Sequence, residues 1–131
     1  MGDTVAMSNY EGAERPRPRF RKQAEPVVGA ADPETLFGDL PRTPNGVGPL
    51  WSAQADQLRT YASEHQETSD VAFELPTGSG KTLVGLLLSE WRRRTLSQRA
   101  VYACPTKQLA RQVHDKAQDQ GIPTVLLTGS H

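Results

Sequence analysis

Residues 76–82 read Pro-Thr-Gly-Ser-Gly-Lys-Thr, a spacing of glycines, lysine and threonine that has a defined chemistry. Glycines let the backbone curl so that successive N–H groups point inward and form a nest for an anion. A helix that begins at such a loop adds its positive dipole end and its unpaired N–H groups. A lysine at this point reaches the outer phosphates of a nucleoside triphosphate, and a threonine hydroxyl is a suitable Mg²⁺ ligand. This stretch therefore predicts a phosphate-binding loop.

The two apolar runs that flank this loop predict the elements that must position it. Residues 71–75 (Val-Ala-Phe-Glu-Leu) predict a strand, and the apolar run at 83–88 predicts a buried helix. A strand, a glycine loop and a helix in this order form the usual phosphate-binding layout. The strict pattern has glycine where this chain has Leu75, so the loop is one particular variety of the motif. The alternative is a glycine turn that simply joins a strand to a helix.

A second motif, Cys-Pro-Thr-Lys-Gln-Leu-Ala-Arg-Gln-Val, lies at residues 104–113. Pro105 and Thr106 are typical of a helix start, which leaves first-turn N–H groups and the Thr106 hydroxyl available to an anion. Lys107 adds a cation beside them. A backbone phosphate of a single nucleic-acid strand would fit this position. The alternative is an ordinary Pro-Thr helix start with a lysine that faces solvent.

The predicted elements alternate between strands and helices. After a helix near residues 50–62 and a loop at 63–70, strands are expected at 71–75, 99–104 and 122–127, and helices at 80–94 and 107–120. Connections of a dozen or more residues imply parallel strands joined by right-handed crossover helices. Both motifs then lie at carboxyl ends of strands, where such sheets bind ligands. The expected fold class is α/β.

Composition divides the chain into three parts. Residues 1–49 contain seven of the ten prolines and six of the eleven glycines, which predicts a disordered tail over residues 1–32. Residues 33–49 are expected to form a linker or a short helical turn, with Asp32 as N-cap and Pro33 in the first turn. Within the tail, residues 15–22 carry five cations around Phe20 and are either a nucleic-acid contact or a solvated arm. The ordered domain is expected over residues 50–131.

The bulk composition favours a protein of a reducing compartment. Lys plus Arg and Asp plus Glu are 15 each, so no global charge draws the chain to a polyanion. The single cysteine, Cys104, excludes an internal disulfide, and no secretory signal is visible. The longest apolar run is too short to span a bilayer. A cytoplasmic location, with no membrane contact and no oligomer, is therefore expected.

The two motifs, separated by one predicted strand, resemble motifs I and Ia of DEAD/DEAH-type superfamily-two helicases. The first is Pro-Thr-Gly-Ser-Gly-Lys-Thr, and the second is Pro-Thr-Lys-Gln-Leu-Ala, in which Lys-Gln replaces the common Arg-Glu. The resemblance covers residues 50–128. It implies a partial RecA-like P-loop NTPase domain, the N-terminal part of an ATP-dependent helicase or translocase.

This resemblance implies a set of site residues. Motif I binds ATP with Mg²⁺, Thr82 is the implied metal ligand, and motif Ia holds the backbone of DNA or RNA. An upstream glutamine reads adenine in many of these helicases, and Gln54 fits better than its rival Gln57, because an amide offers both a donor and an acceptor. The implied ATP-binding residues are Gln54, Thr77, Gly78, Ser79, Gly80, Lys81 and Thr82. The implied nucleic-acid contacts are Pro105, Thr106, Lys107 and Gln108.

Other assignments stay open at this stage. Phe37 is a possible adenine-stacking residue, Trp51 is interpreted as a packing residue, and Arg92-Arg93-Arg94 as cations that favour a helix C-terminus. The family also needs an acidic Asp-Glu pair, which these residues do not contain, so no catalytic residue is assigned and enzymatic activity is left open. The alternatives are another P-loop NTPase, such as a nucleotide kinase or transporter ATPase, and a non-catalytic nucleic-acid-binding remnant.

Overall fold

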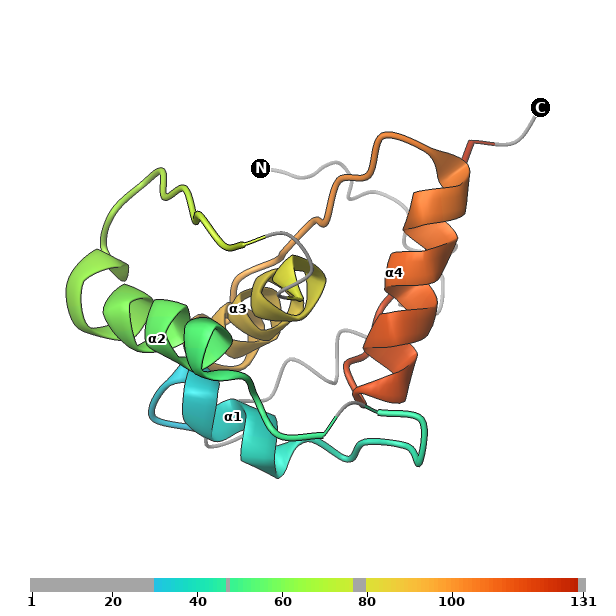
Figure 1. Ribbon diagram of the computed structural model, residues 1–131. Coiled ribbons are helices and arrows are strands. Elements are labelled where there is room, and N and C mark those ends of the chain that lie inside the picture. Colours follow the sequence, from blue (N-terminus) through green and yellow to red (C-terminus); the bar gives the residue numbers. More distant parts are fainter. Residues whose placement is uncertain (1–29, 47, 77–79, 130–131) are drawn as a thin grey trace, which may run out of the picture.

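The structure is a computed structural model that describes residues 30–46, 48–76 and 80–129. Figure 1 shows the described helices with α3 between α1 and α2 on one side and α4 on the other. Their bounds are α1 Pro33–Asp39, α2 Ser52–Thr60, the π-helix η4 Tyr61–His65, α3 Lys81–Leu96 and α4 Lys107–Asp119. The predicted tail over residues 1–32 lies almost entirely outside the described residues.

The predicted α/β fold is wrong for the part of the chain that the structure describes, because that part contains helices and no strand. The expected strands at 71–75, 99–104 and 122–127 run as irregular chain, and no backbone hydrogen bond joins one of them to another. A strand needs a neighbour within about 4.8 Å to pair its backbone. High β-propensity describes a side chain's fit to a half-buried pleated surface. Val101, Val125 and Leu127 have no such surface and are 88%, 82% and 85% exposed.

The short helix α1 forms as its local sequence predicts. The Asp32 carboxylate caps the helix by accepting a hydrogen bond from Thr35 N at 2.7 Å, and Pro33 occupies the first turn. Leu36 and Phe37 are buried against the rest of the core. The predicted helical turn is thus confirmed, and helix α1 packs against α3.

Helix α3 is the centre of the hydrophobic core. Seven of its residues are buried, among them Leu83, Leu87 and Trp91, as the apolar run predicted. The Trp91 ring packs edge-on against the Tyr61 ring, with 6.4 Å between the ring centroids. The Trp91 Nε1 donates a hydrogen bond to Ala30 O at 3.0 Å. Because α3 carries apolar residues almost all round, it is stable only when other elements cover it.

Helix α4 is attached mainly through its C-terminal half. Ala117 is its buried residue, whereas Leu109 near its start is 41% exposed. At the far end, Thr43 N donates to Asp119 O at 2.9 Å, and Gly121 packs on the Pro41 carbonyl with a left-handed φ of 78°. A residue with a Cβ would collide with that carbonyl, so glycine ends the helix here, as predicted.

The segment 99–104 lies along α3. Gly85, in the middle of α3, faces the Tyr102 ring so closely that a Cβ on Gly85 would lie 2.9 Å from Tyr102 Cε2. The close approach of ring and helix therefore depends on glycine at this position.

Among the helices that the structure describes, none is long and apolar enough to cross a bilayer.

Candidate functional site

Helix α3, which the sequence predicts to follow a phosphate-binding loop, begins directly after Gly80. Gly80 is the N-cap of α3 with φ 76° and ψ 45°, a left-handed conformation that strongly favours glycine. A Cβ at Gly80 would also overlap Gln54 Nε2. Lys81 and Thr82, the first two residues of the helix, are exposed and half-buried respectively. The predicted site residues Thr77, Gly78 and Ser79 lie outside the described residues.

Gln54 lies against this helix start, and both ends of its amide bond to the protein. Its Oε1 accepts a hydrogen bond from Trp51 N at 2.9 Å, and its Nε2 donates to Gly80 O at 3.2 Å. The residue is only 5% exposed. The same Gly80 carbonyl accepts from Leu83 N at 3.1 Å, the first backbone bond of α3. Gln54 thus joins the beginning of α2 to the beginning of α3, while its adenine-reading role stays a prediction.

The second motif begins α4. Thr106 is the N-cap, with an extended backbone and a hydroxyl oxygen that accepts from Leu109 N at 3.1 Å. That bond uses the oxygen as an acceptor, so the hydroxyl proton can still be donated. Pro105, Lys107 and Gln108 are exposed. The predicted helix start is therefore confirmed, and the exposed Lys107 fits both a phosphate contact and an ordinary lysine that faces solvent.

The two predicted sites are separate in the described structure. One hydrogen bond joins Gln54 to Gly80, and within the described ranges no hydrogen bond joins either residue to residues 105–108. Residues 30–46, 48–76 and 80–129 also contain no cluster of three or more acidic, histidine or cysteine residues that could hold a metal. Of the predicted residues, Thr82 is the candidate Mg²⁺ ligand whose position the structure describes.

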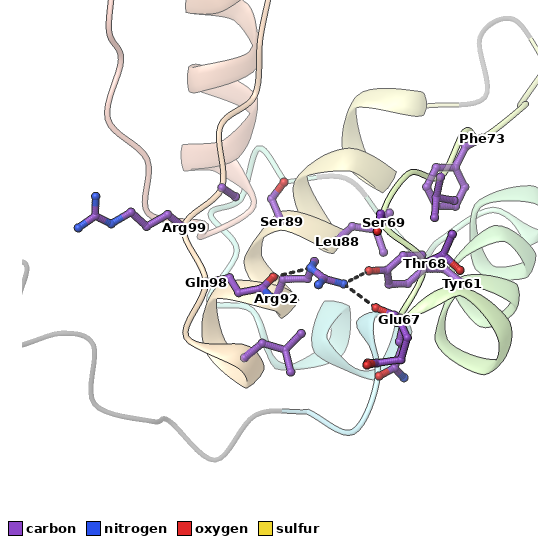
Figure 2. A pocket seen from close by; sticks show the side chains of 14 residues that line it. Tyr61, Glu67, Thr68, Ser69, Phe73, Leu88, Ser89, Arg92, Gln98 and Arg99 are labelled. Atoms are coloured by element: carbon purple, nitrogen blue, oxygen red, sulfur yellow. Dashed lines mark hydrogen bonds between the residues drawn. The ribbon is translucent and has the colours of Figure 1, made fainter.

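A cavity of about 700 Å³ lies beside the C-terminal half of α3. Figure 2 shows Arg92 reaching across it: its Nε donates to Gln98 Oε1 at 2.7 Å, and Nη1 donates to Tyr61 Oη and to Gln66 O at 3.3 Å. Arg92 is eleven residues after Lys81, so roughly 16 Å of helix separates the cavity from the phosphate-binding end. Sequence reasoning missed this feature, because it treated residues 63–70 as a loop and Arg92 as a helix-terminal cation.

The two arginines after Arg92 are held by one buried carboxylate. Glu90 Oε1 accepts from Arg93 Nε at 2.7 Å, and Oε2 accepts from Arg93 Nη2 at 3.0 Å and from Arg94 Nε at 2.7 Å. The hydrogen bond from Glu90 raises the pKa of Arg93, with desolvation acting in the opposite direction. Arg93 and Arg94 are thus paired with Glu90 within the helix, while their effect on the helix C-terminus stays a prediction.

The two aromatic residues considered near the nucleotide site have opposite environments. Phe37 is 6% exposed, and the Arg42 guanidinium lies 4.1 Å from its ring centroid. Trp51 directly precedes α2 and is 58% exposed. The interpretation of Trp51 as a packing residue is therefore wrong, and Phe37 is the residue that packs.

Comparison with known proteins identifies the family that these features belong to. Comparisons with curated proteins and with solved structures gave no match. A family model described as DEAD/DEAH box helicase matches residues 54–130, more than half of the chain. The matched stretch begins at Gln54 and contains both the glycine loop and the second motif. The chain therefore belongs to the DEAD/DEAH box helicase family.

Proposed function

We propose that the chain binds ATP with Mg²⁺ at the start of α3 and contacts a nucleic-acid backbone at the start of α4, as part of a helicase or translocase. The left-handed Gly80 followed by the exposed Lys81 is the observation that carries the nucleotide part of this proposal. The glycine removes the side chain that would obstruct the loop, and the lysine places a cation at a helix N-terminus. The family assignment supports ATP over other phosphate ligands.

The residues available at this point fit a magnesium nucleotide. Lys81 would neutralise the outer phosphates, and the Thr82 hydroxyl would hold Mg²⁺ together with phosphate oxygens. When bound, the metal ion neutralises charge on the β- and γ-phosphates. The protein's own contribution is a preformed helix start, fixed by the bond from Gln54 to Gly80.

The nucleic-acid part of the proposal rests on the exposed start of α4. Thr106 caps the helix by accepting from Leu109 N, which leaves its hydroxyl proton and the N–H groups of Lys107 and Gln108 for a phosphate oxygen. Lys107 beside it supplies the charge that makes backbone contact favourable and dependent on salt. Pro105 and Gln108 complete the exposed surface.

One experiment tests both parts with each variant as the other's control. Binding of labelled ATP with Mg²⁺ and of a fluorescent single-stranded oligonucleotide is measured for the parent chain, Lys81→Ala and Lys107→Ala. The expected result is that Lys81→Ala abolishes ATP binding and leaves oligonucleotide binding intact, with the converse for Lys107→Ala. Unchanged ATP affinity in Lys81→Ala contradicts the nucleotide site. Oligonucleotide affinity that survives Lys107→Ala, but is lost when the cations of residues 15–22 are neutralised, assigns nucleic-acid binding to the arm.

A further inference from the structure

The cavity beside α3 takes no part in the proposed nucleotide and nucleic-acid contacts. Its volume of about 700 Å³ lies within the usual range of ligand-binding pockets. Figure 2 shows that Leu88, Ser89 and Arg92 of α3 lie between its two sides. Residues between 66 and 73 line one side, and residues between 96 and 100 line the other. The cavity is therefore a hollow over one helix, between two stretches of chain without helical structure.

The stretch at 71–75 is held in an extended form with its backbone unpaired. Its odd-numbered residues are buried or half-buried, whereas Ala72 and Glu74 are exposed. This alternation is the period of a strand with one face on a core. In such a chain the N–H and C=O groups point sideways, toward the place of a neighbouring strand. Among the residues that the structure describes, no hydrogen bond involves the backbone of 71–75 or of 99–104.

Arg92 gives the cavity a fixed positive charge that still has donors to offer. Its Nε and Nη1 donate to three residues that line the cavity, so the guanidinium is held in place. Its Nη2 makes no hydrogen bond to the part of the chain that the structure describes. A carboxylate is the acceptor that matches a guanidinium best. Arg92 and Arg99 outnumber Glu67, the acidic residue among the described residues of the lining, which favours a negatively charged ligand.

The unpaired backbone decides which kind of ligand fits this charge. A free small anion would pair with Arg92 and leave the neighbouring N–H and C=O groups to water. An extended peptide would pair with Arg92 and also with the backbone beside it, which is recognition by strand addition. We propose that the cavity binds an extended segment of a partner protein, which adds as a strand beside residues 69–73 and places a Glu or Asp side chain on Arg92. The main-chain bonds supply affinity and the acidic side chain supplies specificity.

Synthetic peptides test the two parts of this recognition separately. The probe is a fluorescein-labelled, amidated hexapeptide of sequence Thr-Val-Glu-Val-Thr-Val, and its binding to the full chain is measured by fluorescence anisotropy. Two matched peptides carry N-methyl groups on the three valines or on the other three residues, which removes the donors of one edge or the other. At least one of them is expected to bind about tenfold more weakly or worse. A peptide with Gln in place of Glu should bind about 10- to 100-fold more weakly, because it lacks the charged acceptor.

A double-mutant cycle assigns the acidic contact to Arg92. Arg92→Gln should weaken the Glu peptide by about 10- to 100-fold and leave the affinity of the Gln peptide within about twofold. Arg111→Gln makes the same change at an exposed position of α4 and should alter neither affinity. Hydrogen exchange of residues 69–73 should slow when the Glu peptide binds, which a structural role of Arg92 would not produce. The peptide comparisons use the parent chain, so they decide the question even when Arg92→Gln fails to fold.

Several results would overturn the proposal. Equal affinity of the parent peptide and both N-methylated peptides would exclude strand addition, and so would a failure of the Glu peptide to bind. Displacement of the Glu peptide by free glutarate, with unchanged exchange at 69–73, would show a site for small anions. Self-association of the chain that the Glu peptide reverses in sedimentation would show that a second copy occupies the cavity. ATP binding and its loss in Lys81→Ala are measured separately, so the proposed function stands or falls on its own.

Discussion

The side-chain nitrogen of Gln54 donates a hydrogen bond to the carbonyl oxygen of Gly80 at 3.2 Å. That carbonyl also accepts the first backbone bond of α3, from Leu83 N at 3.1 Å. The end of the glycine loop is therefore fixed from two sides, by α2 and by α3. A group that is already ordered loses less entropy when a ligand binds, so this bond would favour the affinity for nucleotide in the proposed function.

Substitution of Gly80 tests this arrangement directly. Gly80→Ala forces a Cβ into a left-handed conformation and into the Gln54 amide, so we expect a loss of about 1–3 kcal/mol in unfolding free energy and loss of ATP binding. Urea denaturation and nucleotide binding measure the two effects. The matched control is Gly38→Ala within α1, where a Cβ would contact nothing within 4 Å. That variant should gain up to about 1 kcal/mol. If Gly80→Ala and Gly38→Ala changed the unfolding free energy and ATP binding equally, Gly80 would have no special role at the start of α3.

The hydroxyl of Tyr61 is expected to contribute to stability through Arg92. Tyr61→Phe keeps the ring that packs on Trp91 but removes the oxygen that accepts from Arg92 Nη1. A hydrogen bond to a charged group contributes about 1.5–3 kcal/mol, so a decrease of that size is expected in urea denaturation. Tyr102→Phe is the control, because Tyr102 is 40% exposed and packs through its ring edge on Gly85. Its stability should stay within about 0.5 kcal/mol of the parent.

The buried carboxylate of Glu90 is a second stability determinant. Glu90→Ala leaves two arginines without their shared acceptor, and removal of one partner of a buried ion pair costs about 3–5 kcal/mol. The lower end of that range is expected, because the Arg93 side chain is 37% exposed. The control is Glu34→Gln, whose partner Arg59 has a side chain 60% exposed. Loss of that solvent-exposed pair should leave the urea-denaturation midpoint nearly unchanged.

The pH dependence of this pair follows from the direction of the Arg93 shift. The hydrogen bond that Arg93 donates to Glu90 raises the pKa of Arg93 above its ordinary value. A raised pKa adds stability that is fully present below the unfolded value and is lost only as the pH rises through the folded value. Thermal denaturation at pH 6 to 9 should therefore show no contribution from Arg93 titration. If the difference in melting temperature between the parent and Glu90→Ala became smaller from pH 6 to pH 9, this expectation would be contradicted.

Two substitutions of Thr106 distinguish helix capping from nucleic-acid contact. Thr106→Ala removes the acceptor for Leu109 N, which should cost about 1 kcal/mol and increase hydrogen exchange in the first turn of α4. Thr106→Asp keeps a good N-cap but places a negative charge beside the proposed phosphate contact. Its hydrogen exchange should match the parent, while its oligonucleotide affinity falls. An unchanged affinity in Thr106→Asp would argue against phosphate contact at this helix start.

Sequence reasoning succeeded where the determinants are local. The cap at Asp32, the helix that follows Gly80 and the helix start at Thr106 depend on residues a few positions away. The same reasoning placed Lys81 and Lys107 at helix starts. The choice of Gln54 over Gln57 as the adenine-reading residue stays a prediction, and the bonds that occupy the Gln54 amide depend on two backbone groups whose approach no sequence pattern reports.

It failed where the outcome depends on distant partners. Apolar, β-branched residues near Val101 and Val125 predicted strands, but a strand exists only when another backbone pairs with it. The Arg92 cavity was missed for a related reason. Residues Tyr61–His65 continue α2 as a π-helix, and the Tyr61 hydroxyl at its start accepts a hydrogen bond from Arg92, a residue of α3. The 3.6-residue periodicity of the sequence contains no sign of it.

The attachment of α4 has a mechanical consequence. The helix is held near its C-terminal end, by Thr43 on Asp119 and by Gly121 on Pro41, whereas Lys107 lies at the other end of its 13 residues. At 1.5 Å per residue this helix is about 20 Å long. A rotation of about ten degrees at the held end would displace Lys107 by roughly 3 Å, about the length of a hydrogen bond. If α4 contacts a phosphate as proposed, the backbone around Thr43 and Pro41 would be the pivot that sets how far Lys107 reaches.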